Sequence, residues 1–216
     1  MASDRINLLV LEGDGIGPEI TQATVDVLRH VDGLFGLGLV FTSGDIGFTS
    51  LKTDRTTFTK RVLEAARAAD GIVLGPVSHN VYPPVAEGGL NPSGELRKNL
   101  DLFANIRPSR TRDGVEAPSR KAFDLVVVRE NTEGFYADRS MFMGPGEFMP
   151  TPDVALAIRK ITRHASLRIA REAFDLAMTR RRKVCVVHKA NVLRLSDGLF
   201  LEATRDIATA YPDVEV

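Results

Sequence analysis

The stretch Ile6-Asn-Leu-Leu-Val-Leu-Glu-Gly-Asp-Gly-Ile-Gly-Pro18 decides the fold. It begins as a mostly apolar run and then places three glycines within five residues, which is typical of a strand that ends in a tight turn. Beyond Pro18, which suits the first turn of a helix, apolar residues recur at helical spacing. These residues are Ile20, Ala23, Val27 and Val31. The sequence therefore predicts a strand, a turn and an amphipathic helix.

Two further strands, at residues 39–41 and 71–74, alternate with a helical pattern over residues 51–69. Strands that alternate with helices favour an α/β fold with a parallel or mixed sheet. Residues 75–92 are rich in glycine, proline and asparagine, and they are predicted to form a long loop at the carboxyl end of a strand. Open α/β sheets bind ligands at such ends, so this loop is a candidate site.

The second half of the chain is predicted to continue with helices, strands and an irregular excursion. In order, we expect a helix at 94–100, strands at 103–106 and 123–129, and an excursion at 141–152. Asp153 is expected to cap a long helix over residues 154–176, which carry an apolar stripe. Residues 184–187 predict a buried strand, in which Cys185 would be a small buried hydrophobe.

Positive and negative charges balance, with 28 lysines and arginines against 28 aspartates and glutamates in 216 residues. Zero net charge gives no long-range field that would attract nucleic acid or an anionic membrane. The basic run at residues 180–183 is predicted to be a solvated helix end, because no aromatic residues interleave it. No apolar stretch reaches the about 20 residues of a membrane span, and a single cysteine permits no disulfide within the chain. We therefore expect a cytoplasmic protein that binds neither nucleic acid nor membrane.

Three arginines, Arg97, Arg107 and Arg129, each lie near the end of a predicted element and among apolar residues. Guanidinium groups bind carboxylates through paired hydrogen bonds, so three of them could clamp a di- or tricarboxylate. The alternative is that they are ordinary surface or ion-paired arginines. Tyr136 and Lys189 could serve as proton donor and acceptor, and they could equally be structural residues. The glycine-rich turn also has two interpretations: it is either a structural turn or a loop that binds a ligand.

Four longer strings resemble one family, the β-decarboxylating dehydrogenases of isocitrate, homoisocitrate, isopropylmalate and tartrate. They occur in the family's order: Glu12-Gly-Asp-Gly-Ile-Gly-Pro-Glu19, Leu96-Arg-Lys-Asn-Leu-Asp-Leu-Phe-Ala-Asn-Ile-Arg-Pro108, Val128-Arg-Glu-Asn-Thr-Glu-Gly-Phe-Tyr136 and His188-Lys-Ala-Asn-Val192. The resemblance covers essentially the whole chain and implies the α/β, isopropylmalate/isocitrate dehydrogenase-like two-domain fold, incomplete at the C-terminus. Residues 1–100 would be the first half of a large domain, and residues 101–216 a truncated, dimer-forming small domain.

The resemblance also implies which residues bind the substrate and transfer protons. A (2R)-malate-type substrate would be bound by four residues: Ser93, Arg97, Arg107 and Arg129. Tyr136 would protonate the enolate that decarboxylation leaves, while Lys189 would assist deprotonation of the 2-hydroxyl. Hydride would pass from C2 to NAD or NADP before the β-carboxylate is lost.

Cofactor, metal and partner expectations come from the same resemblance. The nicotinamide cofactor would be contacted by four residues: Ile16, Leu90, Asn91 and Asn191. Lys189 and Asn191 would reach into the partner subunit's site, which makes the active unit a homodimer. Mg or Mn would bind at the substrate, but the family's metal-holding aspartates lie in a region that this chain does not contain. We therefore expect no metal ligand within the chain, and a fragment that is inactive alone.

Several alternatives remain open. The chain could be a non-catalytic regulatory or truncated inactive subunit of the same family, or a general anion-binding α/β module. Retention of the three arginines, Tyr136 and Lys189 favours an enzyme. The substrate stays open among 3-isopropylmalate, isocitrate and tartrate. Pro92 and Gly94 offer no charged partner for the substituent that distinguishes these acids, which favours a small or apolar one.

Overall fold

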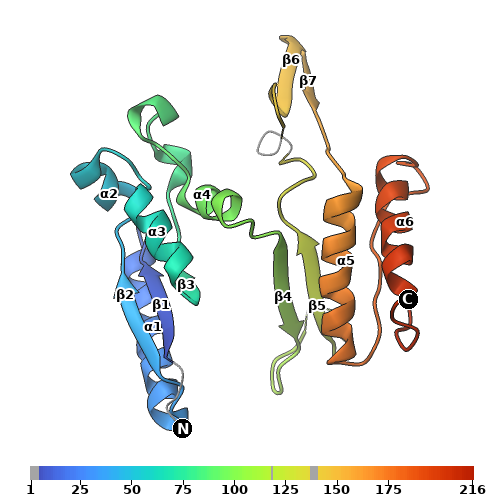
Figure 1. Cartoon of the computed structure of the whole chain (residues 1–216), viewed down its shortest axis with the longest axis horizontal. Helices are drawn as coiled ribbons and strands as arrows, with labels where there is room; N and C mark the ends of the chain where they lie inside the picture. The colour runs from blue at the N-terminus through green and yellow to red at the C-terminus, as the bar shows by residue number, and fades with distance from the viewer. Residues whose placement is uncertain (1–4, 118, 137–140) are drawn as a thin grey trace. The chain divides into compact units, whose positions relative to one another are not determined.

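The computed structural model describes residues 5–117, 119–136 and 141–216. The chain divides into two compact units, Met1–Asp101 and Leu102–Val216. Each unit has its own helices and strands (Figure 1). Each also has its own hydrophobic cluster. Whether these units correspond to half of a large domain and to a dimer-forming small domain stays a prediction.

β1 (Ile6–Leu11) is the central strand of the first unit's sheet, between β2 (Leu39–Ser43) and β3 (Gly71–Leu74). Both neighbours run parallel to β1, and Leu8 lies opposite Phe41 on one side and opposite Gly71 on the other. The predicted parallel α/β arrangement is confirmed for this unit. The carboxyl ends of all three strands therefore meet at one edge, where the loop after β3 begins.

Helices and 3-10 turns accompany this sheet. In chain order they are α1 (Gly17–Phe35), α2 (Gly47–Asp54), α3 (Lys60–Ala68), η1 (His79–Val81), η2 (Val85–Glu87) and α4 (Pro92–Asn99). Buried Leu9 and Leu11 of β1 share one core cluster with Val62 of α3 and Leu96 of α4, and Leu90 packs against it. Burying a leucine side chain contributes about 1.5–3 kcal/mol. This cluster holds α3, α4 and the residues before α4 against the central strand.

The single helix predicted over residues 51–69 is wrong, because the chain forms α2 and α3 with a break between them. Arg55 ends α2 with a left-handed φ of 60°. Thr57, in the break, is 0% exposed, and its hydroxyl donates to the Leu90 carbonyl at 2.5 Å. Thr59 then caps α3 by accepting a hydrogen bond from the Val62 N–H at 3.2 Å. Tertiary bonding of the buried threonine thus outweighs the helical pattern.

The glycine-rich turn after β1 is held by the buried carboxylate of Asp14, which is 7% exposed. Its oxygens accept hydrogen bonds from the N–H groups of Phe48 at 2.8 Å and Ser78 at 2.9 Å, and from the Tyr82 hydroxyl. Gly13 adopts a φ of 77°, and a Cβ there would lie 2.0 Å from a carbonyl oxygen of the loop after β3. At Asp14, therefore, this turn serves structure, because its carboxylate ties β1 to α2 and to the loop after β3.

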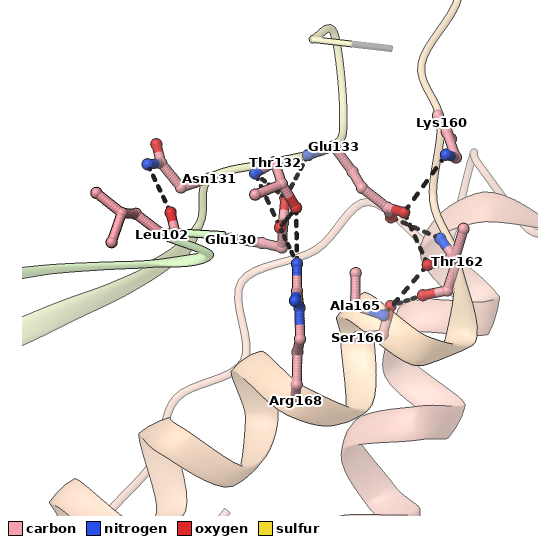
Figure 2. A network of polar contacts seen from close by, with 10 residues as sticks. All are labelled: Leu102, Glu130, Asn131, Thr132, Glu133, Lys160, Thr162, Ala165, Ser166 and Arg168. Carbon is pink, nitrogen blue, oxygen red and sulfur yellow. Dashed lines mark hydrogen bonds and ion pairs between the residues drawn. The ribbon is translucent and has the colours of Figure 1, made fainter. Parts of the chain in front are cut away.

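In the second unit, β4 (Ala104–Arg110) and β5 (Asp124–Glu130) form an antiparallel ribbon. α5 (Arg163–Met178) contacts both β5 and α6 (Ser196–Ala208). The core cluster centres on Phe174 of α5, which is fully buried beside Ala170, Ile207 and Val214. This packing places the amino-terminal end of α5 near the end of β5, where the candidate site begins (Figure 2).

The long helix predicted over residues 154–176, with Asp153 as its cap, is also wrong in its first part. β6 (Glu147–Thr151) and β7 (Val154–Ala157) form an antiparallel hairpin within and after the predicted excursion. The helix begins only at Arg163, with Thr162 as its cap. Thr162 is fixed by a partly buried glutamate from another part of the chain, and this bonding sets where the helix can start.

The strand predicted at residues 184–187 does not form. Lys183 pairs with Glu215 in an isolated parallel bridge, and the Val184 N–H donates to the Glu215 carbonyl at 2.8 Å. Cys185 is exposed, so the prediction of a buried thiol is wrong. The reason is that no further strand in the described part of the chain pairs with this segment and covers it.

No helix in the described residues combines the length and apolarity that crossing a bilayer requires.

We expect Asp14→Ala to lower the free energy of unfolding by about 3 kcal/mol, because it leaves two N–H groups and a hydroxyl, all partly buried, without their acceptor. Urea unfolding followed by circular dichroism measures this change. Asp26→Asn is the matched control, since Asp26 accepts from the exposed Gln22 side chain at 2.7 Å on the same unit's surface. The control should change stability by less than about 0.5 kcal/mol. Equal effects of the two variants would contradict the anchoring role of Asp14.

Candidate active site

In the first unit, several predicted site residues lie in α4 or directly before it. Arg97 and Ser93 are one helical turn apart, and Arg97 Nη2 donates to Ser93 Oγ at 3.3 Å. The Asn91 side chain caps the helix by accepting from the Gly94 N–H at 3.2 Å. Leu90 packs against the core, whereas Ile16, just before α1, is 60% exposed. Ser93 and Arg97 are thus in contact, and the Asn91 side chain caps the amino-terminal end of α4.

In the second unit, Arg107 and Arg129 extend from one face of the β4–β5 ribbon. Asn105 is directly opposite Arg129, and Arg107 lies two residues further along β4, so the three side chains share a face. Positions related in this way are typically about 7–8 Å apart. Arg107 Nε donates to Asn105 Oδ1 at 2.8 Å. Two exposed guanidinium groups therefore lie close enough to contact one small dianion.

Tyr136 lies against Arg129, with the guanidinium carbon 5.7 Å from the centre of the ring. Cations within about 6 Å of an aromatic ring centre are attracted to its face. Both residues line a cavity of about 550 Å³. The same cavity is lined by Glu133, Arg159 and Asp197. Arg129 and Tyr136, which the sequence predicted to act on one substrate, are thus neighbours.

The segment between β5 and Tyr136 is held by the Glu130 carboxylate. It accepts hydrogen bonds from the Thr132 N–H at 2.9 and 3.0 Å, from the Thr132 hydroxyl at 2.5 Å and from the Glu133 N–H at 2.7 Å. Arg168 of α5 donates to Thr132 Oγ1 at 2.9 Å and lies 4.0 Å from Glu130 (Figure 2). This network fixes the turn that leads to Tyr136.

A second carboxylate, Glu133, joins this turn to the start of α5 (Figure 2). It accepts from both the N–H and the hydroxyl of Thr162, each at 2.8 Å, and Lys160 Nζ lies 3.9 Å away. Gly134 and Lys160 also exchange backbone hydrogen bonds of 2.8 and 3.0 Å. Residues 160 and 162 therefore grip the turn two residues before Tyr136.

Lys189 and Asn191 lie on an exposed loop before α6. The Lys189 N–H donates to Asp197 Oδ2 at 2.5 Å, and its carbonyl accepts from the N–H groups of Val192 and Leu193 at 2.9 and 2.8 Å. Asp197 is 3% exposed and is also paired with Arg159. The backbone of Lys189 is thus fixed on both sides, while the side chain lies at the surface.

Sequence reasoning missed the supporting residues of both loops. Glu130, Glu133, Arg159, Thr162 and Asp197 were not among the predicted site residues. Their position could have served as a signal. Charged residues that follow a predicted strand directly, or that lie in the first turn of a helix, are close to free backbone N–H groups, which donate hydrogen bonds.

A complete ligand set for a divalent cation is not found among the described residues, since no group of three or more histidines, cysteines, aspartates or glutamates gathers there. Three acids in the described part of the chain line the cavity, and all of them are already hydrogen-bonded, Glu130 by Thr132. Glu133 is held by Thr162, and Asp197 by Arg159 and Lys189.

The chain is similar to known dehydrogenases over almost its full length. Residues 7–216 match the isocitrate/isopropylmalate dehydrogenase family. The chain is 35% identical over 209 residues to the 3-isopropylmalate dehydrogenase of Archaeoglobus fulgidus, covering 96% of this chain and 58% of the relative. It is 33% identical over 216 residues to the mitochondrial isocitrate dehydrogenase (NAD) subunit 2 of Schizosaccharomyces pombe, covering 100% of this chain and 52% of the relative.

Solved structures agree with these relatives. The isocitrate dehydrogenase of Methylococcus capsulatus superimposes with a TM-score of 0.78 at 35% identity, covering 97% of this chain and 59% of that chain. This chain therefore has the isocitrate dehydrogenase-like α/β fold over the part that it covers, and it spans between half and about three-fifths of the length of the curated relatives named above. Together, the match over residues 7–216 and the shared fold place the chain in the isocitrate/isopropylmalate dehydrogenase family.

Proposed function

We propose that this protein catalyses the NAD(P)- and Mg- or Mn-dependent oxidative decarboxylation of a (2R)-malate-type hydroxy acid. The candidate substrates are 3-isopropylmalate, isocitrate and tartrate. The observation that carries the proposal is that Arg107 and Arg129 share one face of the β4–β5 ribbon and that Tyr136 lies against Arg129. Family membership supplies the reaction class, and this grouping supplies the groups that such a reaction needs.

The arginines are proposed to bind the substrate's carboxylates. Arg107 and Arg129 present two guanidinium groups on one face, and each can form paired hydrogen bonds with a carboxylate. Arg97, with Ser93 one turn away, is proposed to add a third contact. Arginine suits this task better than lysine because its planar donor fork matches the two oxygens of a carboxylate.

Tyr136 and Lys189 are proposed to move the protons. Lys189 assists removal of the 2-hydroxyl proton while a hydride leaves C2, which gives a 2-oxo acid. The C–C bond to the β-carboxylate then breaks, carbon dioxide leaves, and its electron pair forms an enolate. Tyr136 supplies the proton that converts this enolate to the product. Positioned general acids and bases of this kind contribute about a hundredfold to ten-thousandfold.

The nicotinamide cofactor, when bound, accepts the hydride. Ile16, Leu90, Asn91 and Asn191 are the residues proposed to contact it. An exposed isoleucine beside the glycine-rich turn and an exposed asparagine amide suit a ligand that has both apolar and polar faces. The requirement for Mg or Mn is proposed from the resemblance, since no group of three or more histidines, cysteines, aspartates or glutamates gathers among the described residues.

We further propose a cytoplasmic homodimer as the active unit. Lys189 and Asn191 lie on an exposed loop, which fits side chains that reach into a partner's site. The neutral segment around Pro92 and Gly94 favours a small or apolar substituent on the substrate.

The full gene product should form NADH or NADPH with one acid from a panel of 3-isopropylmalate, isocitrate, tartrate and malate. Chelation with EDTA should abolish this activity, and added Mg or Mn should restore it, because the cation stabilises negative charge on oxygen by several kcal/mol, roughly. Absorbance of the reduced nicotinamide measures turnover. A well-folded protein that is silent on every acid with both cofactors would favour a regulatory copy instead.

Arg129→Ala is expected to lower kcat/KM by about a hundredfold, because charge-assisted hydrogen bonds to a carboxylate contribute about 1.5–3 kcal/mol each. Arg110→Ala is the matched control, since Arg110 lies on β4 opposite Asp124 at the far end of the ribbon. Steady-state kinetics on the preferred substrate compare the two. The carboxylate-binding role is wrong if both variants lose activity equally.

Tyr136→Phe is expected to lower kcat by about a hundredfold with little change in KM. The substitution removes the hydroxyl and keeps the ring that lies against the Arg129 guanidinium. Substrate binding should therefore persist, which titration calorimetry can measure directly. A variant that loses affinity but keeps kcat would assign Tyr136 to binding and not to proton transfer.

A further inference from the structure

We propose that Asp197 is a positioning residue for Lys189, and that residues 159–162 link it to the turn that carries Tyr136. We call residues 159–162 the brace. The inference rests on the proposed function, in which Lys189 and Tyr136 transfer protons. It adds that these two groups, which lie on separate loops, are held by one short segment of the chain.

The first contact of the brace is the pair between Arg159 and Asp197. Asp197 lies in the first turn of α6 and is 3% exposed, so its charge needs donors from the protein. One carboxylate oxygen binds Arg159 Nη1, and the other accepts the Lys189 N–H at 2.5 Å. A single buried carboxylate thus connects the brace with the backbone of Lys189.

The ionisation of Asp197 suits this role. Burial by itself raises the pKa of the carboxyl group. The hydrogen bonds from Arg159 and from the Lys189 N–H, with the charges of Arg159 and His188, outweigh burial and hold the pKa below its ordinary value. The group therefore stays anionic at neutral pH and keeps both contacts.

Further hydrogen bonds restrict the conformation of the Lys189 loop. The Lys189 carbonyl accepts from the Val192 and Leu193 N–H groups, and the Leu193 carbonyl accepts from the Asp197 N–H at 3.0 Å. The loop is thereby closed on the first turn of α6. Without the Asp197 carboxylate, the Lys189 N–H loses its acceptor and the loop loses its attachment to Arg159.

The other contacts of the brace reach the Tyr136 turn (Figure 2). Thr162 holds the Glu133 carboxylate through its N–H and its hydroxyl, and Lys160 exchanges backbone hydrogen bonds with Gly134. Only three peptide bonds separate Arg159 from Thr162. A short stretch of backbone therefore joins the residue that pairs with Asp197 to the residue that holds Glu133, and we expect a displacement of Arg159 to reach the Tyr136 turn.

The kinetic test compares Asp197→Ala, Asp197→Asn and Lys189→Ala in the full gene product. Asp197→Ala should lower kcat about a hundredfold, the cost of a misplacement of about 1 Å, with KM changed by less than about twofold. Asp197→Asn should lower kcat less, because the amide oxygen can still accept a hydrogen bond from the Lys189 N–H. In a Lys189→Ala background, Asp197→Ala should lower kcat no further, since the two residues act as one unit.

Arg163→Gln is the matched control. Arg163 also joins α5 to α6, through ion pairs with Glu202 and Asp206, and neither of these partners belongs to the Lys189 loop or to the Tyr136 turn. Its kinetics should equal those of the wild type. If Asp197→Ala costs as much activity in the Lys189→Ala background as in the wild type, Asp197 does not act through Lys189 and the proposal is overturned.

Hydrogen exchange tests the brace without any activity. In Asp197→Ala, amides of residues 186–193 should exchange at least about threefold faster, and so should those of residues 131–136. Arg163→Gln should change neither segment. Faster exchange at residues 186–193 alone would contradict the proposed link to the Tyr136 turn. Unchanged exchange in both segments would contradict the whole proposal. A silent wild-type enzyme would instead count against the proposed function, because the exchange result does not depend on turnover.

Discussion

A carboxylate that is removed from water must be surrounded by hydrogen-bond donors, and this constraint fixes the loops of the candidate site. Asp14 is surrounded by two backbone N–H groups and a tyrosine hydroxyl. Glu133 and Asp197 are surrounded by backbone N–H groups and cations. An unpaired buried charge costs several kcal/mol, roughly, so each carboxylate holds its partners in one geometry. The flexible parts of the chain become ordered where such a group is buried.

This constraint explains which parts of the fold could be predicted from the sequence. β1, the turn and α1 follow from local pattern, because the apolar run, the glycines and the helical spacing all lie within one stretch. The breaks before α3 and α5 could not be predicted in that way. The buried hydroxyl of Thr57 bonds Leu90, and Thr162 bonds Glu133 from 29 residues away. Bonds between distant residues decide these boundaries and leave no periodic signal.

In the candidate site, too, local features could be predicted from the sequence and contacts between distant residues could not. Alternation along a strand is local, and the pairing of β4 with β5 puts Arg107 and Arg129 on one face. The sequence placed Arg129 near the end of a strand correctly, whereas Arg107 is the middle residue of β4, because this strand continues to Arg110. The residues that support them are different. Arg159 meets Asp197 across 38 residues, and no spacing rule joins them. Single-sequence reasoning therefore finds the groups that we propose to bind the substrate more readily than the groups that hold them in place.

The two arginines beside the end of β5 illustrate why residue type alone cannot assign a role. Arg168 comes from α5 and bonds Thr132, lies near Glu130, and its guanidinium is 4.4 Å from the centre of the Phe103 ring. Its charged group therefore interacts with residues of the fold. Arg129 precedes Glu130 by one residue, so it extends from the opposite face of β5, where it is exposed beside Tyr136. The one-residue alternation of the strand thus separates a charge that is bonded within the fold from one that is exposed at the surface.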